Sequence, residues 1–409
     1  MLEPGRTVAE LRELQELTGD ENGAQRVAWT ETWAMARKWL DKKLSDLPVE
    51  KTCDAAGNQW FTLAGDSERA LLIGGHIDSV PNGGWLDGAL NVMAGVEVLR
   101  RVAEEGTPPI TVRLVNWADE EGARFGRSLF GSSAAAGSMA DQDELRQRKD
   151  ADGVSLPDAI ARFDVDLDSA LEAKGELETA AAYLELHIEQ GPVLESMDIP
   201  LGVVLGTFGV ERHQVTFRGQ AAHAGSTPMD KRRDALAGAA RLELELKKIA
   251  GRIGEGAVCT MGGVVTKPGI VTSVVETAEC LLDQRHLETV QLAEMLDNAK
   301  AASRRFAQEE DLEVEWERIW NIEPILFDER LIELADESIK EVAGSSHRLP
   351  SGPLHDAAEV ARAGVPTVML FVQSLRGLSH TKLEDTKEEH LELAVQALDR
   401  LASRTIETL

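Results

Sequence analysis

A histidine and two aspartates early in the chain have the types and spacing expected of ligands for a pair of metal ions. His76 follows two glycines, Asp78 lies two residues later, and Asp87 lies eleven residues after the histidine. An imidazole supplies one metal bond, and a neighbour such as Asp78 can fix the tautomer of the ring from behind it. A carboxylate such as that of Asp87 can bridge two cations. This segment therefore predicts one part of a binuclear metal site.

Further acids and histidines complete a mixed nitrogen and oxygen shell. Glu120 and Glu121 are adjacent, so one carboxylate can bind metal while the other stands free as a general base. In so acidic a chain an isolated acidic pair is more often a solvated turn, and a lone histidine is more often structural than a ligand. We interpret four histidines as structural: His213, His286, His347 and His390. His187 and His380 differ, because each follows or ends an apolar run or a Gly/Ser loop, and with the carboxylates they suit Zn, Mn, Co or Ni.

The bulk composition excludes several classes of protein. The chain has 409 residues and a formal net charge of −28, which argues against a nucleic-acid partner because phosphate binding needs a concentrated basic face. The three cysteines, Cys53, Cys259 and Cys280, lack the spacing of a zinc site or a disulfide framework. No run approaches the roughly 20 apolar residues that span a bilayer, and the N-terminus has no signal-peptide pattern. We therefore expect a cytoplasmic protein with no membrane partner.

Three predicted strands bring these side chains to one edge of a sheet. Residues 70–75 are a continuous apolar run, typical of a strand buried on both faces, and the run ends just before His76. Residues 110–117 and 183–187 are further predicted strands, which end near the acidic pair and at His187. Open α/β sheets place their sites at the carboxyl ends of strands, so we expect the ligands to meet there. The other elements predicted in this part of the chain are helices at 25–44, 89–103, 329–343 and 387–404, a strand at 365–371, and a helical, exposed excursion at 140–180.

The character of the chain changes at about residue 209. Strand-like stretches at 214–218, 262–275 and 312–316 alternate with helical stretches at 234–249 and 295–307. A single core stops growing near roughly 250–300 residues, so two domains are expected. The β-α-β-β-α-β order fits a compact ferredoxin-like α+β module inserted into an α/β domain. The predicted domains are therefore 1–208 with 324–409, and 209–323 inserted between them.

Four motifs make the chain resemble a known enzyme family. They are Gly-His-Ile-Asp-Ser-Val-Pro-Asn-Gly-Gly at 75–84, Asp-Glu-Glu-Gly-Ala-Arg-Phe at 119–125, Glu-Leu-His-Ile-Glu-Gln-Gly-Pro at 185–192, and His-Ala-Gly-Ser-Thr-Pro-Met at 223–229. With these motifs the chain resembles the hydantoinase/carbamoylase branch of the binuclear-metal amidohydrolases, which includes N-carbamoyl-L-amino acid hydrolases, β-ureidopropionases and allantoate amidohydrolases and is related to aminoacylases and carboxypeptidases. The resemblance covers nearly the whole chain. It implies an α/β, mixed-sheet, aminopeptidase-like catalytic domain that binds two metals and carries an inserted dimerisation or lid domain.

The resemblance also implies a role for each candidate residue. One metal ion would be bound by His76, Asp87 and His187, and the other by Asp87, Glu121 and His380. Glu120 would be the general base, and His223 would stabilise the oxyanion of the tetrahedral intermediate from the partner subunit of a homodimer. Gln190 would contact the substrate, and Arg285 would bind the substrate carboxylate, a task suited to a planar guanidinium.

Four positions depart from the family pattern and bear on the substrate. Thr272 stands where the family commonly has asparagine, and a hydroxyl in place of an amide weakens recognition of an ordinary α-carboxylate. Val275 stands in place of a proline, and Leu354 in place of a small residue. Trp85 adds bulk just before Asp87. We expect a reshaped pocket that favours a smaller or less polar substrate, although Trp85 fits a structural plug equally well.

The sequence thus predicts an amidohydrolase that uses two divalent ions, Zn, Mn, Co or Ni, to cleave a C–N bond other than a peptide bond. The most specific form of this prediction is hydrolysis of an N-carbamoyl-L-amino acid to the L-amino acid, ammonia and CO2. Allantoate-type ureides and other N-acyl or amide substrates are alternatives within the same chemistry. A catalytically silent metal- or ligand-binding protein is an alternative of another class, but a broken ligand shell would support it, and here every candidate ligand and Glu120 are intact. A purely structural dimer module is a third alternative, which leaves the acids at the strand ends unexplained.

Overall fold

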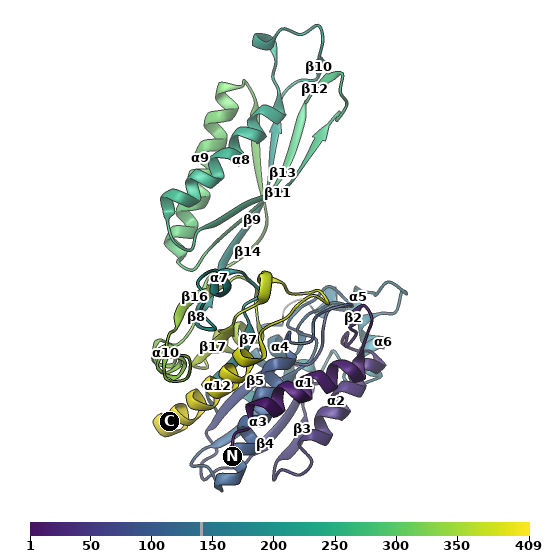
Figure 1. The fold of residues 1–409 in the computed structure, drawn as a ribbon. Helices are drawn as coiled ribbons and strands as arrows, with labels where there is room; N and C mark the ends of the chain where they lie inside the picture. Colours follow the sequence, from purple (N-terminus) through teal and green to yellow (C-terminus); the bar gives the residue numbers. More distant parts are fainter. Residues whose placement is uncertain (140–141) are drawn as a thin grey trace. The chain divides into compact units, whose positions relative to one another are not determined.

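The chain folds into two compact units, in a computed structural model that describes residues 1–139 and 142–409. The first unit consists of Met1–Gly206 and Phe327–Leu409. The second unit, Thr207–Leu326, is inserted between these two segments (Figure 1).

A mixed sheet forms the centre of the first unit, as predicted. Its strand order is β15-β8-β17-β7-β5-β6-β4-β3, and β16 pairs with β8. The strands are β3 (Glu50–Cys53), β4 (Gln59–Leu63), β5 (Ala70–His76), β6 (Thr111–Trp117), β7 (Ala180–Ile188), β8 (Leu201–Thr207), β15 (Ile325–Leu326), β16 (His347–Ser351) and β17 (Thr367–Val372). β17, β7, β5 and β6 are parallel to one another, whereas β8, β4 and β3 pair antiparallel. Every residue of β5 and β17 is buried, which explains their continuous apolar sequences.

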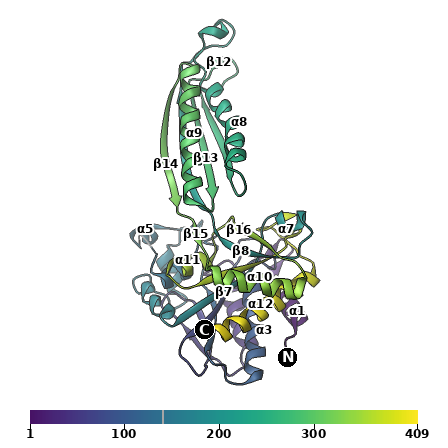
Figure 2. The same cartoon turned by 90° about the vertical axis from the view of Figure 1, so that its left-hand side faces the viewer.

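Long helices cover this sheet. They are α1 (Pro4–Thr18), α2 (Glu31–Lys43), α3 (Ala89–Glu105), α10 (Glu329–Ala343) and α12 (Glu388–Thr408). α3 and α12 pack on β5 and β7, and α1 packs on both of those helices (Figure 2). The predicted helix start at residue 25 is wrong, because the Thr30 hydroxyl accepts the Trp33 N–H and caps α2 at that point. Of the residues before this start, Arg26 and Trp29 instead donate hydrogen bonds to Ile77 and Asp119, next to the candidate ligands.

The excursion predicted at 140–180 is helical but interrupted. Its helices are α5 (Gln142–Gln147), α6 (Leu156–Ala161) and the 3-10 helix η1 (Ala170–Leu177), and Ala140 and Asp141 lie outside the described residues. Gly153, between α5 and α6, and Asp164, after α6, have φ angles of +81° and +60°, which no continuous right-handed helix could include. The remaining short elements are β1 (Gly19–Asp20), β2 (Gly23–Ala24), α4 (Phe130–Ala136), α7 (Val193–Ser196), η2 (Met229–Lys231), α11 (Asp356–Arg362) and η3 (Leu375–Gly377). Across the described part of the chain, no helix has both the length and the apolar character needed to cross a membrane.

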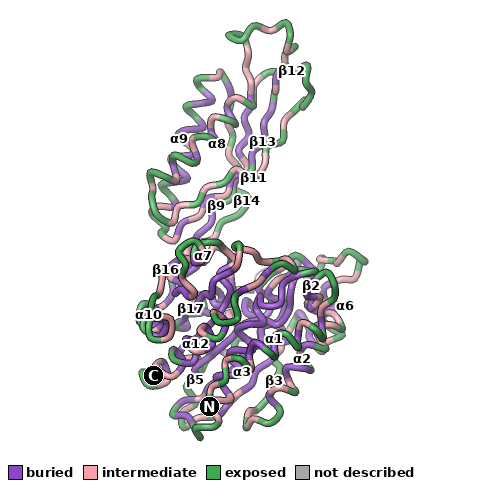
Figure 3. Tube along the Cα trace, in the orientation of Figure 1, coloured by how far each residue is buried: buried purple, intermediate pink, exposed green. Residues whose placement is uncertain are grey.

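The second unit is a four-stranded antiparallel sheet covered by two helices, as predicted. Its elements are β9 (Gly209–Arg218), α8 (Ala235–Ile253), β11 (Val258–Lys267), β13 (Thr277–His286), α9 (Thr289–Glu309) and β14 (Glu313–Ile322), with strand order β11-β13-β9-β14. Its own core lies between the helices and the sheet (Figure 3). A short pair, β10 (Ala222–His223) with β12 (Ser273–Val274), lies at one end of this sheet. The single strand predicted at 262–275 is wrong, because Pro268 lacks an N–H and Gly269 has φ +62°, so β11 ends at Lys267.

Candidate metal centre and active site

Parallel strands deliver the candidate ligands to one edge of the sheet in the first unit. His76 is the last residue of β5, and His187 is the second-last residue of β7. Glu120 and Glu121 follow the end of β6. Asp87 comes directly before Gly88 and α3, and a Cβ at Gly88 would lie 2.3 Å from Nε2 of His76. Only glycine therefore lets the Asp87 loop pass the imidazole so closely.

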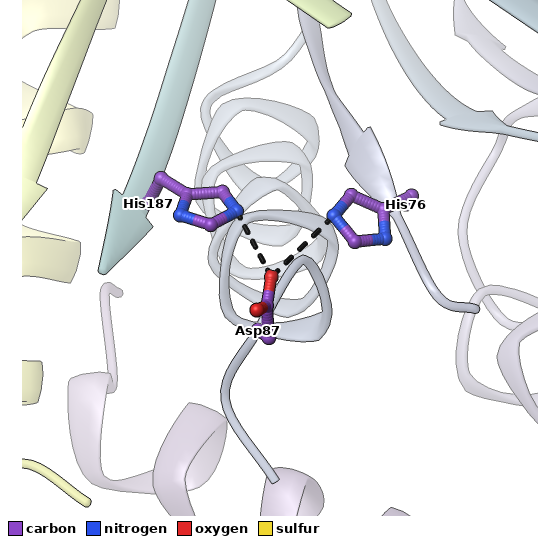
Figure 4. Close-up of side chains that lie close together, drawn as sticks. All are labelled: His76, Asp87 and His187. Carbon is purple, nitrogen blue, oxygen red and sulfur yellow. Dashed lines mark ion pairs between the residues drawn. The ribbon is translucent and has the colours of Figure 1, made fainter. Parts of the chain in front are cut away.

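Three buried side chains form the first ligand group (Figure 4). Oδ1 of Asp87 lies 3.2 Å from Nε2 of His187 and 3.7 Å from Nε2 of His76. The three side chains are at most 5 % exposed. The potential ligand atoms thus converge on one point, with both imidazoles turned toward the same carboxylate oxygen.

The other oxygen of Asp87 belongs to a second ligand group. Nε2 of His380 lies 3.4 Å from Oδ2 of Asp87 and 3.4 Å from Oε2 of Glu121. In each group the potential ligand atoms all lie within 4.8 Å of one another. Asp87 therefore has one oxygen in each group, which is the arrangement that a carboxylate bridging two cations requires.

The hydrogen bonds of the two buried histidines fit a metal site. Nδ1 of His76 contacts the backbone oxygen of Asp78 at 3.1 Å, and Nδ1 of His187 contacts that of Ile188 at 2.9 Å. A carbonyl oxygen only accepts, so Nδ1 carries a proton, and in the neutral ring Nε2 presents its lone pair. Both Nε2 atoms and Oε1 of Glu121 are buried without a hydrogen-bond partner. Burial and the neighbouring Asp87 raise the pKa of Glu121, so the ionised form of its carboxyl is disfavoured. A divalent cation between the two carboxylates would stabilise that ionised form.

Asp78 contacts these ligands through both its backbone oxygen and its carboxylate. Its backbone oxygen accepts the His76 proton, while its carboxylate accepts the backbone N–H groups of Glu120 and Glu121 at 3.3 and 3.2 Å. The carboxylate itself lies 3.6 Å from Nδ1 of His76, too far for a hydrogen bond. Asp78 therefore ties the His76 loop to the acidic pair.

Glu120 has the position and environment of a group that exchanges a proton. Its Oε2 lies 3.7 Å from Nε2 of His76, and the residue is 7 % exposed. Burial raises the pKa of Glu120 well above its usual value, although His76 opposes the shift and Asp356 adds to it. A raised pKa makes the ionised carboxylate a better proton acceptor than an ordinary glutamate.

The two predicted substrate contacts in the first unit have different surroundings. Gln190 lies inside the site, where Nε2 donates to Oδ2 of Asp87 at 2.8 Å and to the Ser379 hydroxyl at 2.9 Å. Leu354 is half-buried and directly precedes His355, whose ring packs on His187 with centroids 4.3 Å apart. Trp85 is buried, and its Nε1 donates to Asp385 at 3.2 Å. Of the two readings of Trp85, these contacts favour the structural plug.

The other predicted site residues lie in the second unit. Nδ1 of His223 accepts the N–H groups of Gly225 and Ser226 at 3.1 and 3.2 Å, so in the neutral ring Nε2 is the donor. The β10–β12 pair brings Thr272 beside His223, since the N–H of Ala224 donates to the Thr272 oxygen at 2.9 Å. Arg285 lies on β13, where its Nε donates to Asp283 at 2.7 Å. That these three residues act with the ligand groups stays a prediction.

Sequence reasoning missed several residues that contact the site. Arg26 is fully buried and donates from Nε to the Ile77 oxygen at 2.8 Å, and burial lowers the pKa of its guanidinium to about 10. Ser379 donates to Oδ2 of Asp87 at 2.7 Å. Burial raises the pKa of Glu384, which accepts two backbone N–H groups of the Asp87 loop, to about 7. The only local signal for the last two was their closeness to His380 in the sequence.

Comparisons with known proteins agree on one family. Residues 72–404 match the model of peptidase family M20/M25/M40. The chain is 35% identical over 396 residues to an N-carbamoyl-L-amino acid amidohydrolase of Geobacillus stearothermophilus, covering 95% of each chain. It is 31% identical over 389 residues to an allantoate amidohydrolase of Bacillus subtilis, covering 93% of this chain and 92% of that one.

The fold agrees with that of a solved relative. A hydantoinase/carbamoylase family amidase from Burkholderia phymatum superimposes with a TM-score of 0.89 and 31% identity, covering 100% of this chain and 98% of that one. This match spans both units, and the family model includes every candidate ligand from His76 to His380. The chain therefore belongs to peptidase family M20/M25/M40 and, within it, to the hydantoinase/carbamoylase amidases.

Proposed function

We propose that this protein uses two divalent metal ions to hydrolyse the carbamoyl group of an N-carbamoyl-L-amino acid. The observation that carries the proposal is the pair of ligand groups that share Asp87, with Glu120 beside them. A mixed shell of imidazole and carboxylate suits Zn, Mn, Co or Ni. The amidohydrolase from Geobacillus stearothermophilus supports the substrate class.

The residues of the site divide the reaction among them. When bound, the two ions would polarise the substrate carbonyl and lower the pKa of water. Glu120 takes a proton from the attacking water and returns it to the leaving nitrogen as the C–N bond breaks. The amino acid leaves as a free amine, and the carbamic acid that remains decomposes to CO2 and ammonia. A donor such as Nε2 of His223, aimed at the developing oxyanion, supplies typically about 2.7–4 kcal/mol of transition-state stabilisation.

The inserted units of two copies of the chain are proposed to contribute residues to each active site. Within one such unit, β13 separates Arg285 from the His223 end by eight residues, or about 26 Å at the usual strand rise. A small substrate cannot contact both ends of one unit. His223 and Thr272 would then come from the partner subunit of a homodimer, while Arg285 binds the substrate carboxylate once it exchanges Asp283 for that ligand.

The substrate alternatives follow from the departures at Thr272 and Leu354. Allantoate and other ureides form the second candidate, favoured by the similarity to the allantoate amidohydrolase of Bacillus subtilis. Other N-acyl substrates share the same chemistry. The proposal includes a cytoplasmic location, in keeping with three cysteines that are all free thiols.

Ammonia release tests the proposal. Mn-loaded protein is incubated with N-carbamoyl-L-amino acids, allantoate, and N-acetyl and dipeptide controls, and the Glu120→Gln variant serves as the blank. We expect ammonia from the carbamoyl set, whereas cleavage of the controls would free only an amine, seen in a parallel amine assay. Ammonia from allantoate alone would select the second candidate. No turnover of any substrate by protein that holds its metal would contradict the proposal and favour a silent metal-binding homologue.

A further inference from the structure

The loop that carries His380 lies outside the regular elements that hold the other two candidate histidines. It runs from η3 to α12, outside any strand, and the His380 side chain is 51 % exposed. The residue has φ +56°, a left-handed conformation that costs free energy unless its surroundings hold it. By contrast, His76 and His187 lie in hydrogen-bonded strands and are 1 % exposed. The second ligand group therefore needs an anchor that the first group does not.

Glu384 makes the contacts expected of such an anchor. Its Oε1 accepts the backbone N–H groups of Leu86 and Asp87, both at 3.0 Å. Its Oε2 lies 3.2 Å from the hydroxyl of Ser379, which lies 2.7 Å from Oδ2 of Asp87. The Glu384 residue is 2 % exposed, so these bonds form away from solvent. One carboxylate thus joins the loop that carries Asp87 to the loop that carries His380, across 297 residues of sequence.

The Asp87 loop is shaped to receive this carboxylate. A Cβ at Gly84 would lie 2.1 Å from Cδ of Glu384, so a larger residue there would displace the glutamate. One residue along the His380 loop, Asp385 accepts from Nε1 of Trp85 at 3.2 Å. The two loops are therefore joined at neighbouring points, and Glu384 is the one that contacts the backbone of a candidate ligand.

We propose that Glu384 is a positioning residue that holds Asp87 and His380 at the spacing the second metal ion requires. This inference rests on the proposed function, because it takes the Asp87, Glu121 and His380 group to be a metal site. Loss of the Glu384 carboxylate frees the exposed His380 loop, whereas His76 and His187 stay fixed by β5 and β7. The second ion should therefore be lost before the first.

Metal binding by the purified full-length protein tests this. Metal-free wild type and the variants Glu384→Ala, Glu384→Gln, Glu384→Leu and Glu389→Ala are titrated with Mn²⁺ by calorimetry, and bound metal is counted after dialysis. Glu389 is the matched control, because its side chain is 74 % exposed on α12. We expect Glu384→Ala to weaken the second binding event about 10–100-fold, the usual effect of losing a partner behind a metal ligand. Glu384→Gln keeps an oxygen for the two N–H groups and should restore most of the affinity. Glu384→Leu fills similar space without an acceptor and should bind the second ion as weakly as Glu384→Ala, which a merely space-filling role would not predict.

Each other outcome is decisive. Two equally tight ions in Glu384→Ala, or equal weakening of both ions in a variant with a wild-type circular dichroism spectrum, would overturn the inference and leave the proposed function intact. Fewer than two ions in the wild type would overturn the proposed function, and this inference with it. If Glu384→Ala does not fold, Gly84→Ala decides, because its Cβ would lie 2.1 Å from Cδ of Glu384 and would displace the carboxylate. Wild-type affinity for both ions in that variant would refute the anchor.

Discussion

Gln190 donates a hydrogen bond from Nε2 to Oδ2 of Asp87, with 2.8 Å between the two atoms. The resemblance to the family implied that Gln190 contacts substrate, but here its amide holds the oxygen that faces His380. The backbone of Gln190 has φ +57°, and its N–H donates to the Ser374 hydroxyl at 3.0 Å. The amide therefore orients the carboxylate that the two ligand groups share. Its loss should change the affinity of the site for metal.

Replacing this amide should weaken metal binding. We expect Gln190→Leu to raise the Mn²⁺ dissociation constant about 10-fold, the lower end of the effect of losing a partner to a ligand. Calorimetric titration measures it, with Gln308→Leu at an exposed position of α9 as the control. A raised KM with unchanged metal affinity would show instead that Gln190 contacts only the substrate.

The acidic pair should separate proton transfer from metal binding. Glu120→Gln is expected to lower kcat by about 10²–10⁴-fold, the usual contribution of general acid–base catalysis, while both ions stay bound. Glu121→Gln, the same change one residue along, should lose the second ion, because Glu121 lies 3.4 Å from His380 in that group. Steady-state ammonia release together with metal counting checks both variants. Wild-type turnover in Glu120→Gln would show that Glu120 is not the general base.

Removing metal should destabilise the first unit selectively. Ions at about 100 times their dissociation constant stabilise a folded unit by about 2.7 kcal/mol, so a chelator should lower its melting temperature. The second unit contains neither ligand group and should not respond. Scanning calorimetry with and without chelator makes the comparison. Asp87→Asn weakens both groups and should show little ion-dependent shift; a full shift in that variant would refute the shared ligand.

The buried carboxylate of Asp336 on α10, paired with two more exposed cations, gives a pH dependence that is separate from the metal site. Burial opposes ionisation of Asp336, but Lys340 at 2.6 Å and Arg348 at 3.0 Å lower its pKa below the usual value. Because the pKa of Asp336 is lower in the folded protein than in the unfolded chain, its ionised form stabilises the fold at pH values above the unfolded pKa of roughly 4. This contribution is lost as the pH falls toward the folded pKa. In metal-free protein, Asp336→Asn should therefore cost about 1–2 kcal/mol at pH 7 and much less near pH 3.

Urea unfolding at both pH values measures this difference. Glu337→Gln on the same helix is the control, because its side chain is 59 % exposed and pairs with Arg404 at the surface. Such pairs contribute at most about 1 kcal/mol. An Asp336→Asn cost that is the same at pH 7 and pH 3 would show that the side chain stabilises the fold by packing rather than by its charge.

The sequence predicted those parts of the fold in which local pattern and environment agree. Residues 70–75 are apolar throughout because β5 is buried on both faces, and the position of His76 at the strand end followed directly. The start of α2 could not be predicted in this way. Trp29 lies within the apolar pattern of the predicted helix, yet its Nε1 donates to Asp119 at 2.7 Å, and that contact holds it outside the helix.

The candidate site was predictable to the extent that its residues have characteristic chemistry. The histidines and acids near strand ends could be read from their types, and His380 was a candidate ligand from its Gly/Ser loop. That His380 shares a metal ion with Asp87 and Glu121 came only from the resemblance to a family. Glu384 and Arg26 could not be found, since each acts through backbone groups of residues 51 to 298 positions away. A hydrogen bond between distant loops does not affect the hydrophobic pattern of either segment, so that pattern cannot predict the bond.

Because β17 lies inside the sheet, the first unit can complete its sheet only late in synthesis. β17 lies between β8 and β7, although it is made about 160 residues after β8, whereas the inserted unit is complete once β14 has been made. A ribosome therefore releases a finished second unit while the first still has an open gap in its sheet. The gap closes only when residues 367–372 emerge, and the last of the candidate ligands, His380, follows within ten residues. His380, the last of the candidate ligands, therefore joins the others only near the end of translation.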